Sequence, residues 1–275
     1  MLLQRILTAV PLALAVIWLI LYQPTTVLFY VLLLVAFISG YEWARLSGVQ
    51  AMVWKLLFAL LVSGVSWLII EYLFQHVYLL LLLACAWWFA VVYFLKSAQP
   101  QAKAAELSAV KLAIAFIVIP STIIAMYVVH GMDRGAEWLL FSLMLVWVAD
   151  SGAYFSGKKF GKIKLAPNIS PGKTREGLWG ALWMTAIFTV LAGFYFDVSG
   201  RQFLLLLGLS LLLTIFSVAG DLYISFLKRE AEVKDSGNIL PGHGGILDRV
   251  DGVLAVMPVF VMMFDWLIIP VEGLH

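Results

Sequence analysis

The sequence predicts an all-α integral membrane protein that crosses the bilayer about nine times, with its N-terminus in the cytoplasm. Of its 275 residues, 63% are hydrophobic and only 12% are charged, whereas soluble domains are about half apolar and about a quarter charged. So few charges cannot cover the surface of a water-soluble protein of this size. A membrane-spanning helix takes about 20 apolar residues, and the hydrophobic residues suffice for eight or nine such helices.

Nine apolar runs along the chain correspond to these helices. The first run follows Arg5 and ends without a small-residue cleavage site, which indicates an uncleaved span rather than a signal peptide. The second run is short unless its helix continues past Glu42, so a count of eight stays open. The runs cover residues 6–22, 27–40, 53–70, 77–95, 109–129, 137–157, 178–196, 202–227 and 252–270.

The distribution of basic residues orients the predicted helices. With the N-terminus inside, 16 of the 18 Lys and Arg residues fall in inner segments, and only Arg134 and Arg201 fall outside. Cytoplasmic loops of membrane proteins carry an excess of Lys and Arg, and a wrong span count would scramble this segregation. We therefore expect the C-terminus on the side opposite the cytoplasm.

The charged residues are concentrated in two segments of the chain. The predicted helices divide into an N-terminal region, 1–130, with five spans, and a catalytic region, 131–275, with four spans and two polar cytoplasmic loops, 150–177 and 228–251. About a fifth of the chain, in and beside these loops, holds 18 of the 34 charged residues. The loops also contain glycines, prolines and carboxylates, which a positive-inside loop does not need, so we expect the chemistry there.

One face of the eighth span carries three polar side chains in order. Asp221, Ser225 and Lys228 stand at positions i, i+4 and i+7, and Arg229 follows at the cytoplasmic end. A carboxylate can hold a hard cation through oxygen while basic groups hold phosphate oxygens. The alternative is an ion pair with a lysine that locks two helices together. That alternative is stronger for Asp150, which lies deeper in its span.

The loop after Lys228 is rich in glycine around His243, and glycines allow backbone N–H groups to converge on an anion. We expect His243 to contact phosphate or to act in catalysis. Asp248 and Asp251 are three residues apart and share a face if the ninth helix has begun. For them, ordinary capping of a helix N-terminus is the alternative.

The other polar loop contains Gly172-Lys173-Thr174, which invites comparison with a P-loop. That motif requires glycine where this chain has Pro167, and no strand is predicted before it, so we reject the comparison. The loop is better interpreted as a lysine-rich segment that neutralises a polyphosphate. Contact with anionic lipid is the alternative.

The loop residues resemble a known family, the phosphatidate cytidylyltransferases, also called CDP-diacylglycerol synthases. The resemblance rests on a long match with fixed gaps, and the first four spans carry no matching motif. The matching segments are Ser225–Arg229, Lys234–Gly237 and Leu240–Asp251, together with Asp150–Tyr154, Lys164–Pro167 and Ser170–Thr174 in the other polar loop.

The resemblance implies that CTP and phosphatidic acid react to give CDP-diacylglycerol and pyrophosphate in phospholipid biosynthesis, with Mg²⁺ required and a second, monovalent cation left open. It also implies a homodimer among membrane lipids in a bacterial inner membrane, with its site facing the cytoplasm. The lipid phosphate would attack the α-phosphorus of CTP directly. A net charge of +2 gives no reason to expect nucleic-acid binding.

Residue roles follow from these patterns and from the resemblance, which implies Asp221 and Asp248 as metal ligands. The predicted catalytic residues are Asp221, Lys228, Arg229, His243 and Asp248. The predicted metal ligands are Asp150, Asp221, Asp248 and Asp251. The predicted substrate-binding residues are Ser151, Lys164, Ser170, Lys173, Thr174, Ser225, Lys234, Asp235, Gly244, Gly245 and Arg249.

Three other functions fit parts of the same pattern. A CTP-dependent lipid kinase could use a similar polar face but would release CDP instead of pyrophosphate. A transporter would place its acidic residues near the midplane and often shows repeated halves, and neither feature is present in the sequence. An intramembrane protease using Ser225 and His243 would lack an evident oxyanion arrangement.

Overall fold

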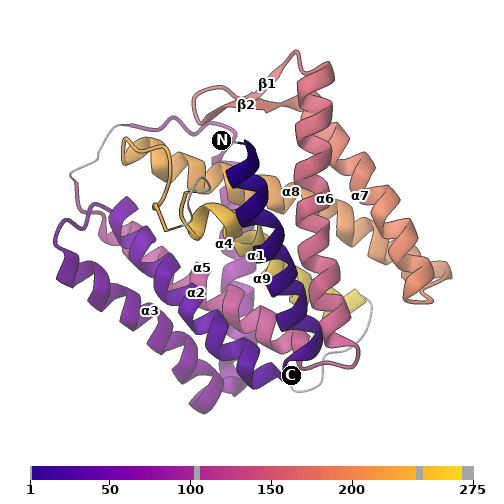
Figure 1. The fold of residues 1–275 in the computed structure, drawn as a ribbon, viewed down its shortest axis with the longest axis horizontal. Coiled ribbons are helices and arrows are strands. Elements are labelled where there is room, and N and C mark those ends of the chain that lie inside the picture. Colours follow the sequence, from indigo (N-terminus) through magenta and orange to yellow (C-terminus); the bar gives the residue numbers. More distant parts are fainter. Residues whose placement is uncertain (1, 102–105, 240–243, 268–275) are drawn as a thin grey trace.

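The computed structural model describes residues 2–101, 106–239 and 244–267, with side chains described from residue 10 to residue 265 within those ranges. These ranges contain nine α-helices, one short 3₁₀ helix (η1, Phe74–His76) and one two-stranded sheet (Figure 1). The helices are α1 (Leu2–Tyr22), α2 (Thr25–Leu46), α3 (Met52–Tyr72), α4 (Val77–Phe94), α5 (Ala109–His130), α6 (Gly135–Phe160), α7 (Arg175–Tyr195), α8 (Gly200–Glu230) and α9 (Leu247–Leu267).

The predicted all-α, polytopic membrane fold is confirmed. Seven helices, α2 to α8, are long and apolar enough to cross a membrane in the part of the chain searched, and α1 adds a shorter apolar helix, Val10–Tyr22. Helix α2 continues past Glu42 to Leu46 and reaches 22 residues, which resolves the open count in favour of nine helices. Helix α9 has 21 residues but starts with charged side chains in its first turns.

Glycines bring the helices of the catalytic region unusually close together. A side chain at Gly152 of α6 would meet the backbone of Gly180 in α7, and one at Gly220 of α8 would collide with the carbonyl of Asp251 in α9. Because no Cβ atoms intervene, the backbones can approach closely. The contact at Gly220 places Asp221 next to the first turns of α9.

Pro258 interrupts the hydrogen bonding of α9 in the middle of the bundle. Proline has no N–H, so the carbonyl four residues earlier loses its helical partner. That carbonyl, on Leu254, accepts a hydrogen bond from the Thr122 hydroxyl of α5 at 3.1 Å. A side chain of α5 thus satisfies the orphaned group and fixes α9 against α5.

The polar loop predicted at 150–177 is only partly a loop. Helix α6 continues to Phe160, and β1 (Lys164–Ala166) pairs antiparallel with β2 (Ser170–Thr174), with Ala166 opposite Ser170. The sequence of these short strands has no alternation of apolar and polar residues that would predict them. The hairpin is held by tertiary contacts instead: its tip residue Ile169 is buried and accepts a hydrogen bond from Arg229 of α8 at 3.2 Å.

Several connections meet at one end of the helical bundle. Lys111 at the start of α5 forms an ion pair with Glu230 at the end of α8 at 2.9 Å, and Ser108 donates to the carbonyl of Ser47 at 2.9 Å. Figure 1 shows the hairpin and the start of α1 at one end of the molecule. The ends of α2, α6 and α8 therefore gather near the starts of α5 and α9, as alternating spans require.

The orientation of this end toward the cytoplasm remains a prediction, and two cysteine variants test it. In a Cys85→Ala background, which removes the one native cysteine, Lys162→Cys lies at the hairpin end and Asp133→Cys lies between α5 and α6; both positions are exposed. A membrane-impermeant maleimide should label Asp133→Cys in intact spheroplasts and Lys162→Cys only after permeabilisation. The reverse pattern would contradict the predicted orientation.

Candidate active site

Three carboxylates from three different helices interact electrostatically near the hairpin end. Asp251 of α9 is within electrostatic range of Asp221 of α8 and Asp150 of α6, and Asp150 is also within range of Asp221. The close approach of α8 to α9 at Gly220 brings two of these residues together. Like charges at such separations repel, so the cluster needs cations nearby.

The hairpin supplies one of those cations. Lys173 of β2 lies 2.6 Å from Oδ2 of Asp221, and both side chains are partly exposed. Ser225, one turn further along α8, donates its hydroxyl to Oδ1 of Asp221 at 3.2 Å. The predicted alignment of Asp221 and Ser225 on one face is therefore present, and the predicted alternative of a lysine ion pair is also present, although its lysine comes from the hairpin.

Asp248 has a different environment from the other three acids. Its Oδ1 forms an ion pair with Lys228 at 2.7 Å. Its Oδ2 accepts hydrogen bonds from the backbone N–H groups of Ser236 and Gly245, at 2.8 and 2.9 Å. The Ser236 hydroxyl lies 3.0 Å from the same oxygen and shares its single hydrogen between Asp248 and Glu42 of α2. The sequence predicted that backbone N–H groups of this loop would converge on an anion. In the structure, the N–H groups of Ser236 and Gly245 converge on the carboxylate of Asp248. Asp248 closes the loop between α8 and α9.

The glycines of this loop fit around that carboxylate. Gly244 has a φ angle of +81°, which favours glycine, and a Cβ atom there would approach Oδ2 of Asp248. A Cβ atom at Gly245 would collide with Ser236 and with Glu42 of α2. The loop is therefore built closely around two acidic side chains.

The remaining predicted site residues fall into three groups. Thr174 is buried and caps α7 by accepting the N–H of Gly177 at 3.1 Å, and the Ser151 hydroxyl donates to the carbonyl of Trp147 at 2.8 Å. His243 lies outside the described residues. The others lie at the surface or partly exposed on the hairpin, the end of α8, the following loop or the start of α9: Lys164, Ser170, Arg229, Lys234, Asp235 and Arg249.

Sequence reasoning missed Glu42. This side chain comes from the N-terminal region, where no motif was matched, yet its carboxylate accepts hydrogen bonds from Ser236, Ile246 and Leu247 in the catalytic region. A signal was present, because an acidic residue inside an apolar span is costly and usually has a specific partner. In the sequence, Glu42 bears only on whether the second apolar run is long enough to span the membrane.

The acidic cluster has the donor chemistry that Mg²⁺ requires. Mg²⁺ is usually held by one or two carboxylates together with water and substrate phosphates, and Asp150, Asp221 and Asp251 offer such carboxylates. Among the described residues, no three Asp, Glu, His or Cys side chains converge into a complete metal site. The donors therefore fit a cation shared with a phosphate substrate better than a cage built by protein alone.

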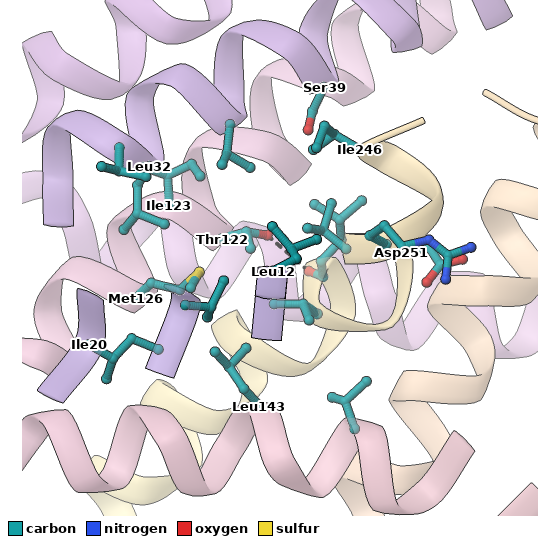
Figure 2. A pocket seen from close by; sticks show the side chains of 18 of the residues that line it. Leu12, Ile20, Leu32, Ser39, Thr122, Ile123, Met126, Leu143, Ile246 and Asp251 are labelled. Atoms are coloured by element: carbon teal, nitrogen blue, oxygen red, sulfur yellow. Dashed lines mark hydrogen bonds between the residues drawn. The ribbon is translucent and has the colours of Figure 1, made fainter. Parts of the chain in front are cut away.

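An apolar cavity of about 810 Å³ opens beside this cluster. Its wall consists of side chains from α1, α2, α5, α6 and α9, including Leu12, Leu32 and Met126, and its charged lining residues are Asp150, Asp248, Arg249 and Asp251. Figure 2 shows Asp251 at one side of the pocket, away from the apolar residues Ile20 and Met126. The same cavity is thus lined by apolar side chains and by carboxylate and guanidinium groups.

The fold and site define an integral membrane protein with a charged site beside an apolar cavity. Known sequences narrow this class. The chain belongs to the cytidylyltransferase family, whose model matches residues 3–267. The family resemblance predicted from the loop residues is confirmed.

Individual relatives match over different lengths. The chain is 35% identical to the phosphatidate cytidylyltransferase of Pseudomonas aeruginosa over 268 residues, which cover 96% of this chain and 97% of that protein. It is 41% identical to the phosphatidate cytidylyltransferase of Haemophilus influenzae over 197 residues, 68% of each chain. The enzyme of the same name from Bacillus subtilis is 47% identical over 135 residues, 47% of this chain and 48% of that protein.

Proposed function

We propose that this protein transfers a cytidylyl group from CTP to phosphatidate, giving CDP-diacylglycerol and pyrophosphate. The observation that carries the proposal is the cavity, because its apolar wall suits acyl chains and its charged lining residues include Arg249 and two members of the acidic cluster. A lipid in this space would present its phosphate to the charged groups. Family membership supports the nucleotide half of the reaction.

The chemical step needs little proton transfer. A phosphate oxygen of phosphatidate, already an anion, attacks the α-phosphorus of CTP and forms a new P–O bond. The bond from the α-phosphorus to the bridging oxygen breaks, and that oxygen leaves with pyrophosphate. Catalysis therefore consists mainly of alignment and of neutralising the charge on the triphosphate.

The basic side chains around the cluster are suited to that task. Lys173 and Arg249 interact electrostatically with Asp150, and Lys173 forms an ion pair with Asp221. Mg²⁺ held by Asp150, Asp221 or Asp251 would add positive charge beside the phosphates when bound. Because the Asp248 side chain is only 6% exposed and accepts donors from Lys228, Ser236 and Gly245, whereas that of Asp221 is 31% exposed, we assign Asp248 first to the loop and leave its ligand role as a prediction.

The reaction class is tested with the purified protein in detergent. With CTP, MgCl₂ and phosphatidic acid, we expect release of pyrophosphate that depends on the lipid. Diacylglycerol in place of phosphatidic acid is the control, because a lipid kinase would phosphorylate it and release CDP. CDP release with diacylglycerol, without pyrophosphate from phosphatidic acid, would overturn the proposal.

Lys173→Ala tests the role of the hairpin. We expect the apparent KM for CTP to rise about 10-fold, the effect of losing one charge-assisted hydrogen bond, with little loss of stability because the Lys173–Asp221 pair is partly exposed. Lys159→Ala removes the same charge from an exposed position at the end of α6 and serves as the control. Equal CTP dependence in the two variants would contradict the role of Lys173.

A further inference from the structure

Glu42 connects the N-terminal helices to the start of α9. The residue is 1% exposed. Its Oε1 accepts the N–H of Ile246 at 3.1 Å, and its Oε2 accepts the N–H of Leu247 at 2.8 Å and the hydroxyl of Ser236 at 2.8 Å. Arg45, one turn further along α2, donates to the carbonyl of Ser236 at 3.3 Å.

These contacts amount to a helix cap supplied from a distant part of the chain. The first N–H groups of an α-helix have no partner within the helix, and a carboxylate there also interacts favourably with the positive end of the helix dipole. Helix α9 begins at Leu247, so Glu42 occupies the position of its N-terminal cap. Figure 2 shows Ser39, one turn earlier on α2, beside Ile246.

The loop packs closely against the carboxylate of Glu42. A Cβ atom at Gly237 or at Gly245 would collide with the carboxylate of Glu42. Glu42 is therefore in close contact with Gly237, which follows α8, and with Gly245, which precedes α9. A shift of Glu42 must move the loop or the first turn of α9.

We propose that Glu42 is a positioning residue for the cytidylyl transfer. It fixes the first turn of α9, and with it Arg249 and Asp251, against Asp221 on α8. This inference rests on the proposed function, because Arg249 and Asp251 matter as parts of that site. A misplacement of about 1 Å in a catalytic site can reduce turnover about 100-fold, so a residue that touches no substrate can control kcat.

The test compares Glu42→Gln with Ser142→Ala. Glutamine keeps the size of the side chain but turns one acceptor into a donor that faces donors. Ser142 is a matched control, because its buried hydroxyl contacts Met257 of α9 at 3.2 Å, far along the helix from Leu247. We expect the unfolding temperature to fall in Glu42→Gln, because its amide faces buried N–H donors. With both variants assayed well below their unfolding temperatures, we expect kcat to fall about 10- to 100-fold in Glu42→Gln and to change little in Ser142→Ala.

Hydrogen exchange gives a readout that needs no activity. In substrate-free protein, the amides of Ile246 and Leu247 should exchange faster in Glu42→Gln than in the wild type or in Ser142→Ala. If the wild type is active, then wild-type exchange or wild-type kcat in Glu42→Gln would overturn the positioning role. A wild type without lipid-dependent pyrophosphate release would instead overturn the proposed function, and the two failures are thus distinct.

A milder variant covers the case in which Glu42→Gln does not fold. Arg45→Met removes the hydrogen bond to the carbonyl of Ser236, together with one positive charge, and leaves the Glu42 carboxylate in place. We expect a smaller fall in kcat, about 3-fold to 10-fold on the scale of one hydrogen bond, and faster exchange at Ile246. Wild-type kcat and exchange in Arg45→Met, beside a Glu42→Gln protein that cannot fold, would reduce Glu42 to a folding role and overturn the proposal.

Discussion

Asp221→Asn is expected to reduce turnover by about 100-fold or more while the protein remains folded. Asp221 interacts electrostatically with Lys173 and Lys228 and with Asp251. Removing one preorganised electrostatic group from an active site typically costs about 100- to 1000-fold in kcat. Asparagine keeps the shape of the side chain and its hydrogen bond with Ser225.

The stability of Asp221→Asn should change little for a specific reason. The side chains of Asp221 and Lys173 are 31% and 24% exposed, and solvent-accessible ion pairs contribute only about 0–1 kcal/mol. The control is Asp197→Asn, at an exposed position between α7 and α8 with a φ angle of 56° that asparagine tolerates. Wild-type turnover in Asp221→Asn would refute the central role of this carboxylate.

Asp248→Asn is expected to lose both turnover and stability. The Asp248 and Lys228 side chains are only 6% and 13% exposed, and breaking a buried pair by removing one partner costs about 3–5 kcal/mol. The amide group of asparagine would also face the N–H donors of Ser236 and Gly245. We expect a clearly lower unfolding temperature in the same assay that finds Asp221→Asn nearly unchanged.

Lys228→Met separates the two roles predicted for Asp248. This variant removes the ion pair but leaves the hydrogen bonds from Ser236 and Gly245 in place, so its unfolding temperature should fall less than that of Asp248→Asn. If Asp248→Asn loses turnover with an unchanged unfolding temperature, the loop-closing role is wrong and the predicted metal-ligand role is favoured. The pair of variants thus tests the assignment in both directions.

Local sequence patterns predicted the helices and the family well. Hydropathy located the helices because each span must satisfy its backbone inside the bilayer by itself, and this requirement leaves a long apolar run in the sequence. The hairpin was not predicted, because its strands are three and five residues long and are held by contacts such as Arg229 to Ile169. Such contacts join residues that no local pattern relates.

Within the site, the sequence predicted the residue types but not their partners. Asp221, Ser225 and Lys228 share one helix face, yet Lys228 pairs with Asp248 and the cation beside Asp221 is Lys173. Both pairings depend on how α8, α9 and the hairpin pack. The close approach at Gly220 that sets this packing could not be distinguished from any other glycine in a span.

The amino-acid sequence alone determined an all-α membrane protein with eight or nine spans, a resemblance to the phosphatidate cytidylyltransferases, and acidic and basic residues gathered in two polar segments, because hydropathy, charge and motif spacing are local properties. Only the tertiary structure decided which donors each carboxylate accepts, that Asp150, Asp248 and Asp251 line one cavity, and that Glu42 from the second helix caps the ninth. The physical reason is that a buried charge is stabilised by whichever donors the packing brings to it, and those donors come from anywhere along the chain.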